Sequence, residues 1–488
     1  MAVLDRPREL TSREADLLSS MYGTIIAKRQ RNELRSRYFD GKKRLDQMGI
    51  SIPPQMAQFE AVVGWPAKTC TVLARRLKPE GFTMPFESSL LGDVTSIFES
   101  NGMAAAERQA ILSAVKHSAS FVFVTRGDTS KGEPDPLVTV RSAMAATAVV
   151  DPRSRLTTSA LEVISNVRVN MYLPGVTLQC VRRPAGWLVE AEWETTPGFV
   201  LCTPYVHGAT VERPFGQSRI TRPVMAYTDM AVRTMLRQEV SAEFYSSPQR
   251  YMLGADASMF QDKDGNPIPG WEAVVGGLLV APDNVDEDTP DNVRRVEVGQ
   301  FPQMSMQPHT DQLRSIAMMF TGESSIPINY LGIIHDNPSS AEAIYANEAD
   351  LVSVAEDEQV GMSPARESLA RNVLIAMNDG MTDAMERDLR GLKSKWRDAS
   401  TPTRQAQTQD VVMQIQAGVL PPNSVVALER LGYSDRDIQR IQADSRRGAV
   451  SQLVANIGER VTAAESGPVA AATAAERGSV VEVDAEAA

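Results

Sequence analysis

Apolar residues recur along residues 216–246 with the three-to-four-residue spacing of an amphipathic helix. The positions of this apolar stripe are Ile220, Val224, Tyr227, Ala231, Met235, Val240 and Phe244. Thr221 can cap the first free backbone N–H groups, and Pro223 falls in the first turn, where its missing N–H is harmless. Pro248 disfavours helical geometry at Ser247 and ends the run. The pattern predicts a helix of roughly 25 residues and about 37 Å, which needs packing partners along its length.

From Ser118 onward the pattern changes to an alternation of period two with many β-branched residues. Five stretches predict strands of an antiparallel sheet: SFVFVTRG, LVTVRSAM, ALEVISNVRVNMYL, VTLQCVRR and GWLVEAEWE. Upstream of them, a helix is expected from about Gln55 to Leu77, with Pro66 bending or splitting it. The first 215 residues are therefore expected to form an α+β region.

Residues 247–303 hold short strand candidates between two helical patterns. The candidates are RYMLG, GGLLVAP and RRVEVGQF. Residues 262–266, between the first two candidates, are predicted to form an Asp-Gly hairpin turn. A calcium loop there would need Gly at Pro267 and a bidentate Glu at Ala273. A second helix from about Gln307 to Thr321 then returns the chain, so the layout is helix, small β-rich excursion, helix.

Residues 326–340 form an apolar segment that cannot be a regular helix. Pro327, Gly332 and Pro338 interrupt it, while three apolar residues are unusual for a surface loop: Leu331, Ile333 and Ile334. On residue patterns alone, a buried connection is favoured over a functional loop. The next helix is expected to run toward Asn378 with an interruption near Gly361 and Pro364.

Beyond residue 400 the helical patterns become short and polar. Gly418 and Gly432 are expected to stop two of these helices. From about Thr462 the chain consists mainly of Ala, Glu, Val and Gly without bulky aromatics. Such a composition cannot bury enough apolar surface to offset its ordering entropy, so this tail is expected to be disordered or weakly helical.

Composition is that of a globular protein large enough for several domains. The chain has 488 residues, of which 43% are hydrophobic and 23% charged. No apolar run reaches the length of a membrane span, so we expect a cytoplasmic protein unless a partner carries it elsewhere. Its cysteines, Cys70, Cys180 and Cys202, are widely separated and predict buried thiols, because they have neither disulfide nor zinc spacing.

The formal net charge of −11 bears on possible partners. A protein that grips DNA usually presents a basic face, since phosphate neutralisation supplies most sequence-independent affinity. An acidic chain would attract DNA weakly. Alternatively, the acidic balance only keeps the protein soluble.

Motifs for common enzyme classes are absent from the sequence. There is no G-x-x-x-x-G-K-[ST] phosphate loop, no G-x-S-x-G elbow and no H-E-x-x-H pair. The histidines are scattered singly: His117, His207, His309 and His335. Dispersed carboxylates could still bind Mg²⁺ for hydrolysis, so the sequence leaves a carboxylate-dependent hydrolase open as an alternative.

Several stretches resemble the portal proteins of tailed bacteriophages, the head-to-tail connectors of the siphophage type. The stretches are GQSRITRPVMAYTDMAVRTMLRQEVSAEFYSSPQRYMLGAD from Gly216, INYLGIIHDNPSSAEAIYANEADLV from Ile328, WRDASTP from Trp396 and RYFDGKKRLDQMGISIPPQM from Arg37. The likeness covers most of the chain, is spread over moderately specific strings and includes no single diagnostic motif.

The resemblance implies an α+β portal fold with a fixed order of parts. These would be a wing (1–215), a first stem helix (216–246), a clip (247–303), a second stem helix (304–325), a tunnel loop (326–340), a long helix returning to the wing (341–400), a helical crown (401–461) and a disordered tail (462–488). With the likeness, residues 326–340 are expected to be the tunnel loop instead of a buried connection.

The resemblance also implies where DNA and partners meet the chain. The tunnel loop would present Leu331, Gly332, Ile333, Ile334, His335, Asp336 and Asn337 to the channel. The charged stem positions would be Arg233, Arg237 and Arg314, and the docking positions of the clip would be Arg250, Arg294 and Arg295. No catalytic residue, cofactor or metal site is implied.

A portal protein would form a homo-oligomeric, dodecameric ring at one capsid vertex of the virion, after assembly in the host cytoplasm. Double-stranded DNA would pass through it without sequence specificity during packaging and ejection. Its partners would be the terminase, the major capsid and scaffolding proteins and a head-tail adaptor, with no membrane involved. Another capsid-associated connector or minor head protein remains an alternative, beside the hydrolase.

Overall fold

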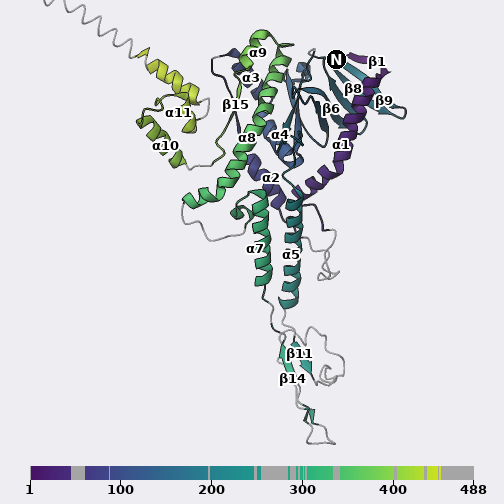
Figure 1. Cartoon of the computed structure of the whole chain (residues 1–488), viewed down its shortest axis with the longest axis vertical. Helices are drawn as coiled ribbons and strands as arrows, with labels where there is room; N and C mark the ends of the chain where they lie inside the picture. The colour runs from purple at the N-terminus through teal and green to yellow at the C-terminus, as the bar shows by residue number, and fades with distance from the viewer. Residues whose placement is uncertain are drawn as a thin grey trace, which may run out of the picture. The chain divides into compact units, whose positions relative to one another are not determined.

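The computed structural model of the protein is shown in Figure 1. It describes residues 2–45, 61–86, 88–195, 198–246, 250–253, 284–285, 293–294, 297–300, 302, 305–332, 341–400, 404–433, 437–448 and 450–451. The chain divides into two compact units, Met1–Ala399 and Ser400–Ala488. Helices and strands both build the first unit, whereas the described part of the second is helical.

A six-stranded antiparallel sheet in the first unit has the order β1-β9-β8-β7-β6-β5. Its strands are β1 (Ala2–Glu9), β5 (Ala146–Val150), β6 (Thr157–Ser165), β7 (Arg168–Leu173), β8 (Val176–Arg183) and β9 (Gly186–Glu194). The period-two pattern correctly predicted β6 to β9. It missed β1, whose charged sequence carries no apolar alternation.

Helix α1 (Ser12–Phe39) lies along this sheet in Figure 1. A capping box starts it: the Thr11 hydroxyl accepts from the Glu14 N–H, and the Glu14 carboxylate accepts from the Thr11 N–H. The helix buries one apolar face, and the residues that form this cluster with the sheet include Leu18, Met21, Ile25, Leu161, Val169 and Met171. Burial of this face holds α1 on the sheet.

A second antiparallel sheet has the order β10-β3-β4. Its strands are β3 (Ala119–Thr125), β4 (Leu137–Ser142) and β10 (Cys202–Val206), with a short 3-10 turn, η2 (Thr129–Lys131), before β4. Val122 belongs to the core cluster with helix α4 (Met103–His117), whereas Phe123 packs on Tyr172 of the first sheet with ring centroids 4.7 Å apart. The prediction of one sheet is therefore wrong, because alternation along a strand does not specify which strands it pairs with.

Shorter elements complete this part of the first unit. They are α2 (Trp65–Arg76), α3 (Ser89–Ser100), α9 (Asp383–Leu389) and the antiparallel pair β2 (Pro79–Thr83) and β15 (Lys393–Trp396). The expected helix from Gln55 to Leu77 is wrong at its start, since residues 61–64 are not helical and residues 55–60 lie outside the described part. Pro66 occupies the first turn of α2, where no N–H is needed, and does not bend a longer helix.

Two antiparallel helices, α5 (Arg222–Ser246) and α7 (Gln307–Ser324), lie side by side in Figure 1. Thr221 caps α5 by accepting from the Val224 N–H at 3.4 Å, as the sequence predicted. Between the helices, β11 (Arg250–Leu253) pairs with β14 (Glu297–Gln300), and β12 (Asn284–Val285) pairs with β13 (Val293–Arg294). Two of the predicted strands are thus present, while the third, 276–282, and the turn at 262–266 lie outside the described residues.

Helix α8 (Ala341–Met377) runs without a break through Gly361 and Pro364, so the expected interruption there is wrong. Core side chains on both sides of the proline explain why the helix continues: Met362 and Leu369 are fully buried. Side-chain bonds also brace this turn, since Ser363 donates to the Gln359 carbonyl at 2.7 Å and accepts from the Trp396 indole at 2.8 Å. Tertiary packing here outweighs the local cost of proline.

In the second unit, α10 (Arg404–Gln416) and α11 (Val425–Arg430) are followed by a helical stretch over 437–448. Gly418 and Gly432 follow the first two helices in the left-handed conformation, as predicted for helix stops. The tail 462–488 lies outside the described residues. No described helix has the length and hydropathy that a bilayer span requires. The α+β class predicted from sequence is confirmed.

Candidate functional site

The α5–α7 hairpin is packed against the core of the first unit at one end. Val224 and Ala231 of α5 share a cluster with Ile316 and Phe320 of α7, and Phe320 lies 5.1 Å from the Trp65 ring of α2. Polar contacts join the helices at both ends: Ser241 Oγ lies 3.2 Å from His309 Nε2, and Thr221 Oγ1 lies 3.5 Å from a Glu323 carboxylate oxygen. These contacts set the register of the two helices.

The stem arginines predicted from sequence all lie on this hairpin and are half-buried. Arg233 and Arg237 are on α5, and Arg314 is on α7. The Nε atoms of Arg237 and Arg314 are buried without a hydrogen-bond acceptor among the described residues. Buried polar atoms are rarely left in this state.

The segment that leads into the predicted tunnel loop is anchored by a polar network. The 3-10 turn η4 (Ile328–Leu331) brings Tyr330 to Glu348 of α8, where the phenol donates to the carboxylate at 2.5 Å. Arg76 of α2 donates to the other Glu348 oxygen at 2.9 Å and to the Ala399 carbonyl at 2.7 Å. The network ties the chain before residues 333–340 to the chain after them.

Burial and hydrogen bonding shift the pKa values of Arg76 and Tyr330 in this network. Burial works to lower the pKa of Arg76, but its bonds to Glu348 and Tyr330 outweigh burial and raise it. Burial raises the pKa of Tyr330, and its bond to Glu348 raises it further. Arg76 therefore stays charged and the Tyr330 hydroxyl stays protonated at neutral pH.

Leu331 and Gly332 line a groove of about 500 Å³ beside this network. Its other walls come from α2, α5 and α7, through Trp65, Met235 and Leu313. Gly332 ends η4 in the left-handed conformation with φ +78°. The remaining predicted tunnel-loop residues, Ile333, Ile334, His335, Asp336 and Asn337, lie outside the described residues.

The predicted docking residues of the clip fall on two separate strand pairs. Arg250 begins β11 opposite Gln300, and Arg294 on β13 is opposite Asn284. Arg295 lies outside the described residues. The backbone therefore places Arg250 and Arg294 on different two-stranded ribbons.

A buried ion pair at the centre of the first unit was not foreseen from sequence. Arg366 of α8 is fully buried, and its Nε donates to a Glu107 oxygen of α4 at 2.6 Å. The guanidinium lies 4.8 Å from the Phe82 ring and 4.8 Å from the Trp396 ring. It also donates to backbone carbonyls of β2 and β15, at 3.2 and 3.0 Å. Because the partners are hundreds of residues apart, no local pattern signals them.

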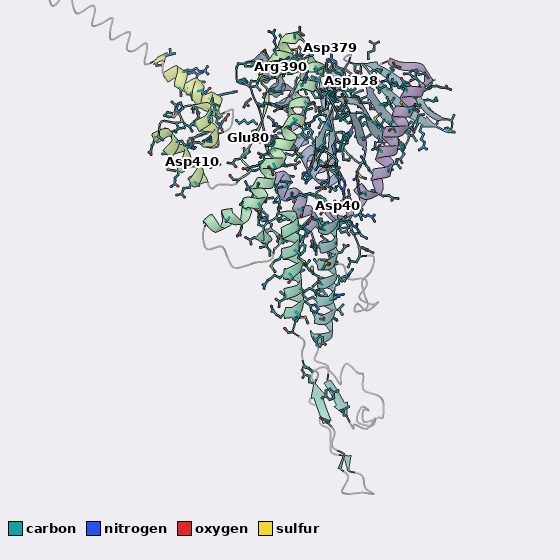
Figure 2. All side chains as sticks on the ribbon, in the orientation of Figure 1. Asp40, Glu80, Asp128, Asp379, Arg390 and Asp410 are labelled. Atoms are coloured by element: carbon teal, nitrogen blue, oxygen red, sulfur yellow. The ribbon has the colours of Figure 1, made fainter. Side chains whose placement is uncertain are left out.

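Carboxylates in the first unit pair with basic groups in place of clustering with one another. Three of those labelled in Figure 2 illustrate this: Asp40 lies 3.8 Å from Lys116, Glu80 lies 2.6 Å from Arg397 and Asp128 lies 2.7 Å from Lys131. Within the described residues no group of three His, Cys, Asp or Glu is arranged to hold a metal.

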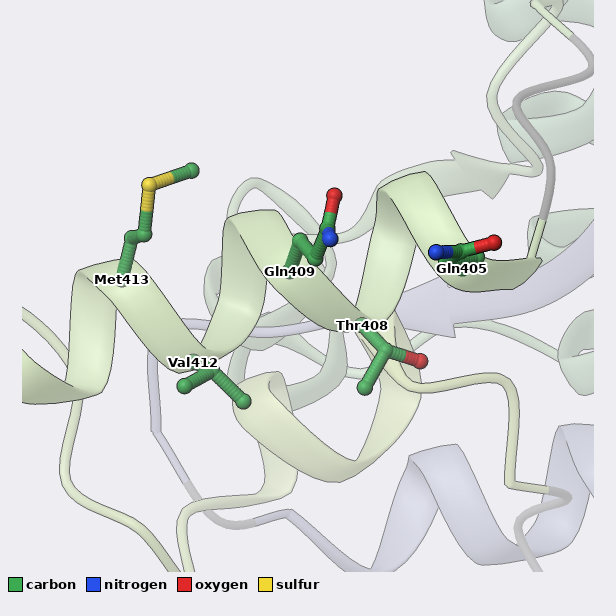
Figure 3. A pocket seen from close by; sticks show the side chains of 5 residues that line it. All are labelled: Gln405, Thr408, Gln409, Val412 and Met413. Carbon is green, nitrogen blue, oxygen red and sulfur yellow. The ribbon is translucent and has the colours of Figure 1, made fainter.

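A hollow of about 560 Å³ lies along one face of α10. Figure 3 shows its lining side chains, Gln405, Thr408, Gln409, Val412 and Met413. None of these five is an acid or base at neutral pH, so the hollow offers no general acid–base pair. The predicted buried thiols are confirmed, and burial raises the pKa of Cys70 to about 12.

The chain is similar to known proteins over most of its length. A curated "Portal protein" of Mycobacterium phage L5 is 24% identical over 421 residues, which cover 83% of each chain. The "Portal protein" of Mycobacterium phage D29 is 26% identical over 426 residues, again 83% of each chain. No family model matches.

Two solved structures are also similar at low identity. One comes from the virion of a native gene transfer agent particle, with 11% identity, a TM-score of 0.44 and coverage of 82% of this chain and 93% of that one. The other comes from the neck of that particle, computed with C12 symmetry, with 11% identity, a TM-score of 0.40 and coverage of 75% and 89%. By the similarity of its sequence to the two phage proteins, the chain is a relative of the portal proteins of tailed bacteriophages.

Proposed function

We propose that the protein is a structural portal: copies of it form a ring at one capsid vertex, and double-stranded DNA passes through the hole during packaging and ejection. The similarity to two phage portal proteins over 83% of the chain is the observation that carries this proposal. The antiparallel α5–α7 pair supports it, because such hairpins standing side by side would make the wall of a tube. The role is geometric and needs no catalytic residue.

Each part of the chain has a place in this proposal. Residues 1–215 serve as the wing, which meets the major capsid and scaffolding proteins. The clip, 247–303, docks the terminase during packaging and a head-tail adaptor afterwards, with Arg250, Arg294 and Arg295 as candidate contacts. Residues 401–461 form the crown. The protein is then a component of the virion, assembled in the host cytoplasm.

The channel would be lined by the stem and by the tunnel loop, residues 331–337. DNA slides only if no site holds it tightly, and the net charge of −11 per subunit keeps the overall attraction weak. Arg233, Arg237 and Arg314 are candidates for the few basic groups near the channel. Anchoring of Tyr330 and Glu348 by Arg76 would hold both ends of the loop at fixed points of each subunit.

Electron microscopy of the purified full chain tests the ring. Closed rings with an axial hole support the proposal, whereas monomers at every concentration and in capsid precursors contradict it. Rings that never occupy a capsid vertex would indicate the alternative of another connector or minor head protein.

Deletion of residues 331–337 tests the loop. We expect the deletion variant to form rings and to lose DNA packaging, measured as nuclease-protected DNA per capsid, because the buried residues that join α5 to α7 lie outside the deleted segment. A deletion of equal length in the tail, 480–486, is the control and should package normally. Normal packaging by the loop deletion would remove the proposed role of the loop.

A further inference from the structure

Helix α5 carries a narrow stripe of residues on its exposed side. Steps of four, three and four residues keep one face of a helix in line. The stripe consists of Ala226, Met230, Arg233 and Arg237. Ala226 is exposed, and 39% of the Met230 surface is exposed, which is high for a large apolar side chain.

Helix α7 carries a stripe with the same spacing. It consists of Asp311, Ser315, Met318 and Gly322, all of them exposed. Met318 keeps 47% of its surface accessible. A Cβ added at Gly322 would meet nothing within 4 Å, so the space above this glycine is open. Both stripes lie roughly opposite, around their helices, from the buried positions that join α5 to α7, which are Val224, Ala231, Ile316 and Phe320. Within the α5 stripe, Arg233 and Arg237 are half-buried.

The two stripes are at matching heights on the hairpin. Ser241 is level with His309, and Thr221 is level with Glu323, because each pair is in contact. Between these contacts lie 20 residues of α5 and 14 of α7, and interpolation puts Met230 within about two residues of Met318 and Arg237 within about one residue of Asp311. Within each helix the methionine and the charged residue are seven positions apart, about 10.5 Å along the axis.

The members at each height are complementary. At one level each helix carries a methionine, and near the other an arginine of α5 is level with an aspartate of α7. The Nε of Arg237 is buried and lacks an acceptor among the described residues. The exposed Asp311 carboxylate accepts from Gln307 of its own helix at 2.9 Å and from no other described residue. Both stripes also carry a small residue near the core end of the hairpin, Ala226 and Gly322, and small residues permit close approach of two backbones.

We propose that a second copy of this chain covers these stripes: the α5 stripe of one subunit packs on the α7 stripe of the next, with Met230 on Met318 and Arg237 paired with Asp311. The contact is heterologous, since each subunit offers a different face on each side, and repeated contacts of this kind close into a ring. This inference rests on the proposed ring and names the side chains that join its subunits.

Charge reversal tests the pairing in the purified full chain. Arg237→Asp and Asp311→Arg each set like charges against one another, so we expect roughly a tenfold or greater loss of rings by native mass spectrometry. The double variant Arg237→Asp/Asp311→Arg restores opposite charges and should regain rings. Glu239→Arg is the control: this exposed carboxylate lies on α5 but roughly 200° around the helix from Arg237, and its reversal should leave rings intact.

The possible outcomes separate this inference from the proposed function. If the unsubstituted chain forms no ring, the proposed function fails. If it forms rings and the single reversals also do, or if the double variant fails to recover, the pairing is refuted while the ring stands. In the case that Arg237 faces DNA, the single reversals would leave rings intact and alter packaging alone.

Cross-linking gives a second readout that does not depend on the reversed charges. The double variant Met230→Cys/Met318→Cys, oxidised with copper phenanthroline, should give a ladder of covalent oligomers on a denaturing gel, because each subunit carries both halves of the contact. Met230→Cys alone is the matched control and should give no ladder, since the native cysteines are buried. Absence of a ladder from intact rings of the double variant would refute the pairing.

Discussion

Arg366 of α8 and Arg237 of α5 are both arginines on helices that border the core, and their surroundings differ. Arg366 is fully buried, pairs with Glu107 and lies between the rings of Phe82 and Trp396. Arg237 is half-buried, and its Nε has no acceptor among the described residues. The bonds of Arg366 are all made within its own chain, whereas Arg237 is the residue that we propose to pair with a neighbouring subunit.

The same substitution at the two arginines should separate these roles most strongly. Arg366→Ala leaves the Glu107 carboxylate buried without its partner, so we expect a loss of about 3 to 5 kcal/mol in the free energy of unfolding. Arg237→Ala should cost less than about 1 kcal/mol in the isolated subunit, because its guanidinium forms no hydrogen bond or ion pair with a described residue of the subunit. Urea denaturation of the protein diluted to monomers measures both values.

Arg390, labelled in Figure 2, supplies the control for this pair of variants because it is exposed at the end of α9. Arg390→Ala should change the free energy of unfolding by no more than about 0.5 kcal/mol. If Arg366→Ala and Arg237→Ala lowered the free energy of unfolding equally, Arg237 would stabilise its own subunit as Arg366 does. The contrast between the two regions would then disappear.

His117 shows that an unsatisfied polar atom does not always mark a partner. It lies buried at the end of α4, its Nδ1 forms no hydrogen bond with the part of the chain that the structure describes, and its Nε2 lies 3.5 Å from Ser36 Oγ. Burial lowers the pKa of His117 to about 4, with further lowering by Lys116 and Arg35 and an opposing effect of Asp40. Residues of its own chain enclose His117, so the missing hydrogen bond lowers the stability of the folded subunit and does not mark a surface for another molecule.

The burial of neutral His117 should make the free energy of unfolding depend on pH. The unfolded histidine binds its proton near pH 6.5 and the folded one near pH 4, so the unfolded state holds more protons in between and stability falls as pH drops through that window. Between pH 7 and pH 5 this histidine should account for a loss of about 2 kcal/mol. Denaturation midpoints of His117→Gln should therefore fall less over the same range.

Ser36→Ala is the matched control, since it removes the side chain near Nε2 and keeps the imidazole. It should retain the pH dependence of the unsubstituted chain. An unchanged slope in His117→Gln would show that other groups carry the acid sensitivity, and His117 would then be an ordinary satisfied core residue.

The same contrast explains how much of the fold the sequence could predict. Strands β6 to β9 follow from period-two alternation, and α5 follows from Thr221 and Pro223 at its start, because these signals are local. Strand β1 forms only by pairing with β9, so its charged sequence gave no sign of it. Pro364 predicted a break that packing of α8 prevents. Local signals were sufficient where neighbours in sequence determine the structure.

The candidate site divides in the same way. The stem arginines could be located from the sequence because they belong to a helix with clear caps, whereas the anchors of the tunnel-loop segment could not. Arg76 and Glu348 are 272 residues apart, and Arg366 and Glu107 are 259 apart. Bonds of this kind are properties of the folded chain, and no spacing in the sequence encodes them.

Tyr330 gives the smallest expected effect and the finest test of the contrast, because its hydroxyl belongs to a network closed within the subunit. Tyr330→Phe removes the bond donated to Glu348 at 2.5 Å but leaves the Arg76–Glu348 pair at 2.9 Å. We expect a loss of about 1.5 kcal/mol in the free energy of unfolding, typical of a hydrogen bond to a charged group. Tyr433→Phe, at an exposed tyrosine of the second unit, is the control and should have no measurable effect. If Tyr330→Phe also leaves the free energy of unfolding unchanged, the subunit does not need this network for its stability. Arg76 would then belong with Arg237, as a residue whose role lies outside its own chain.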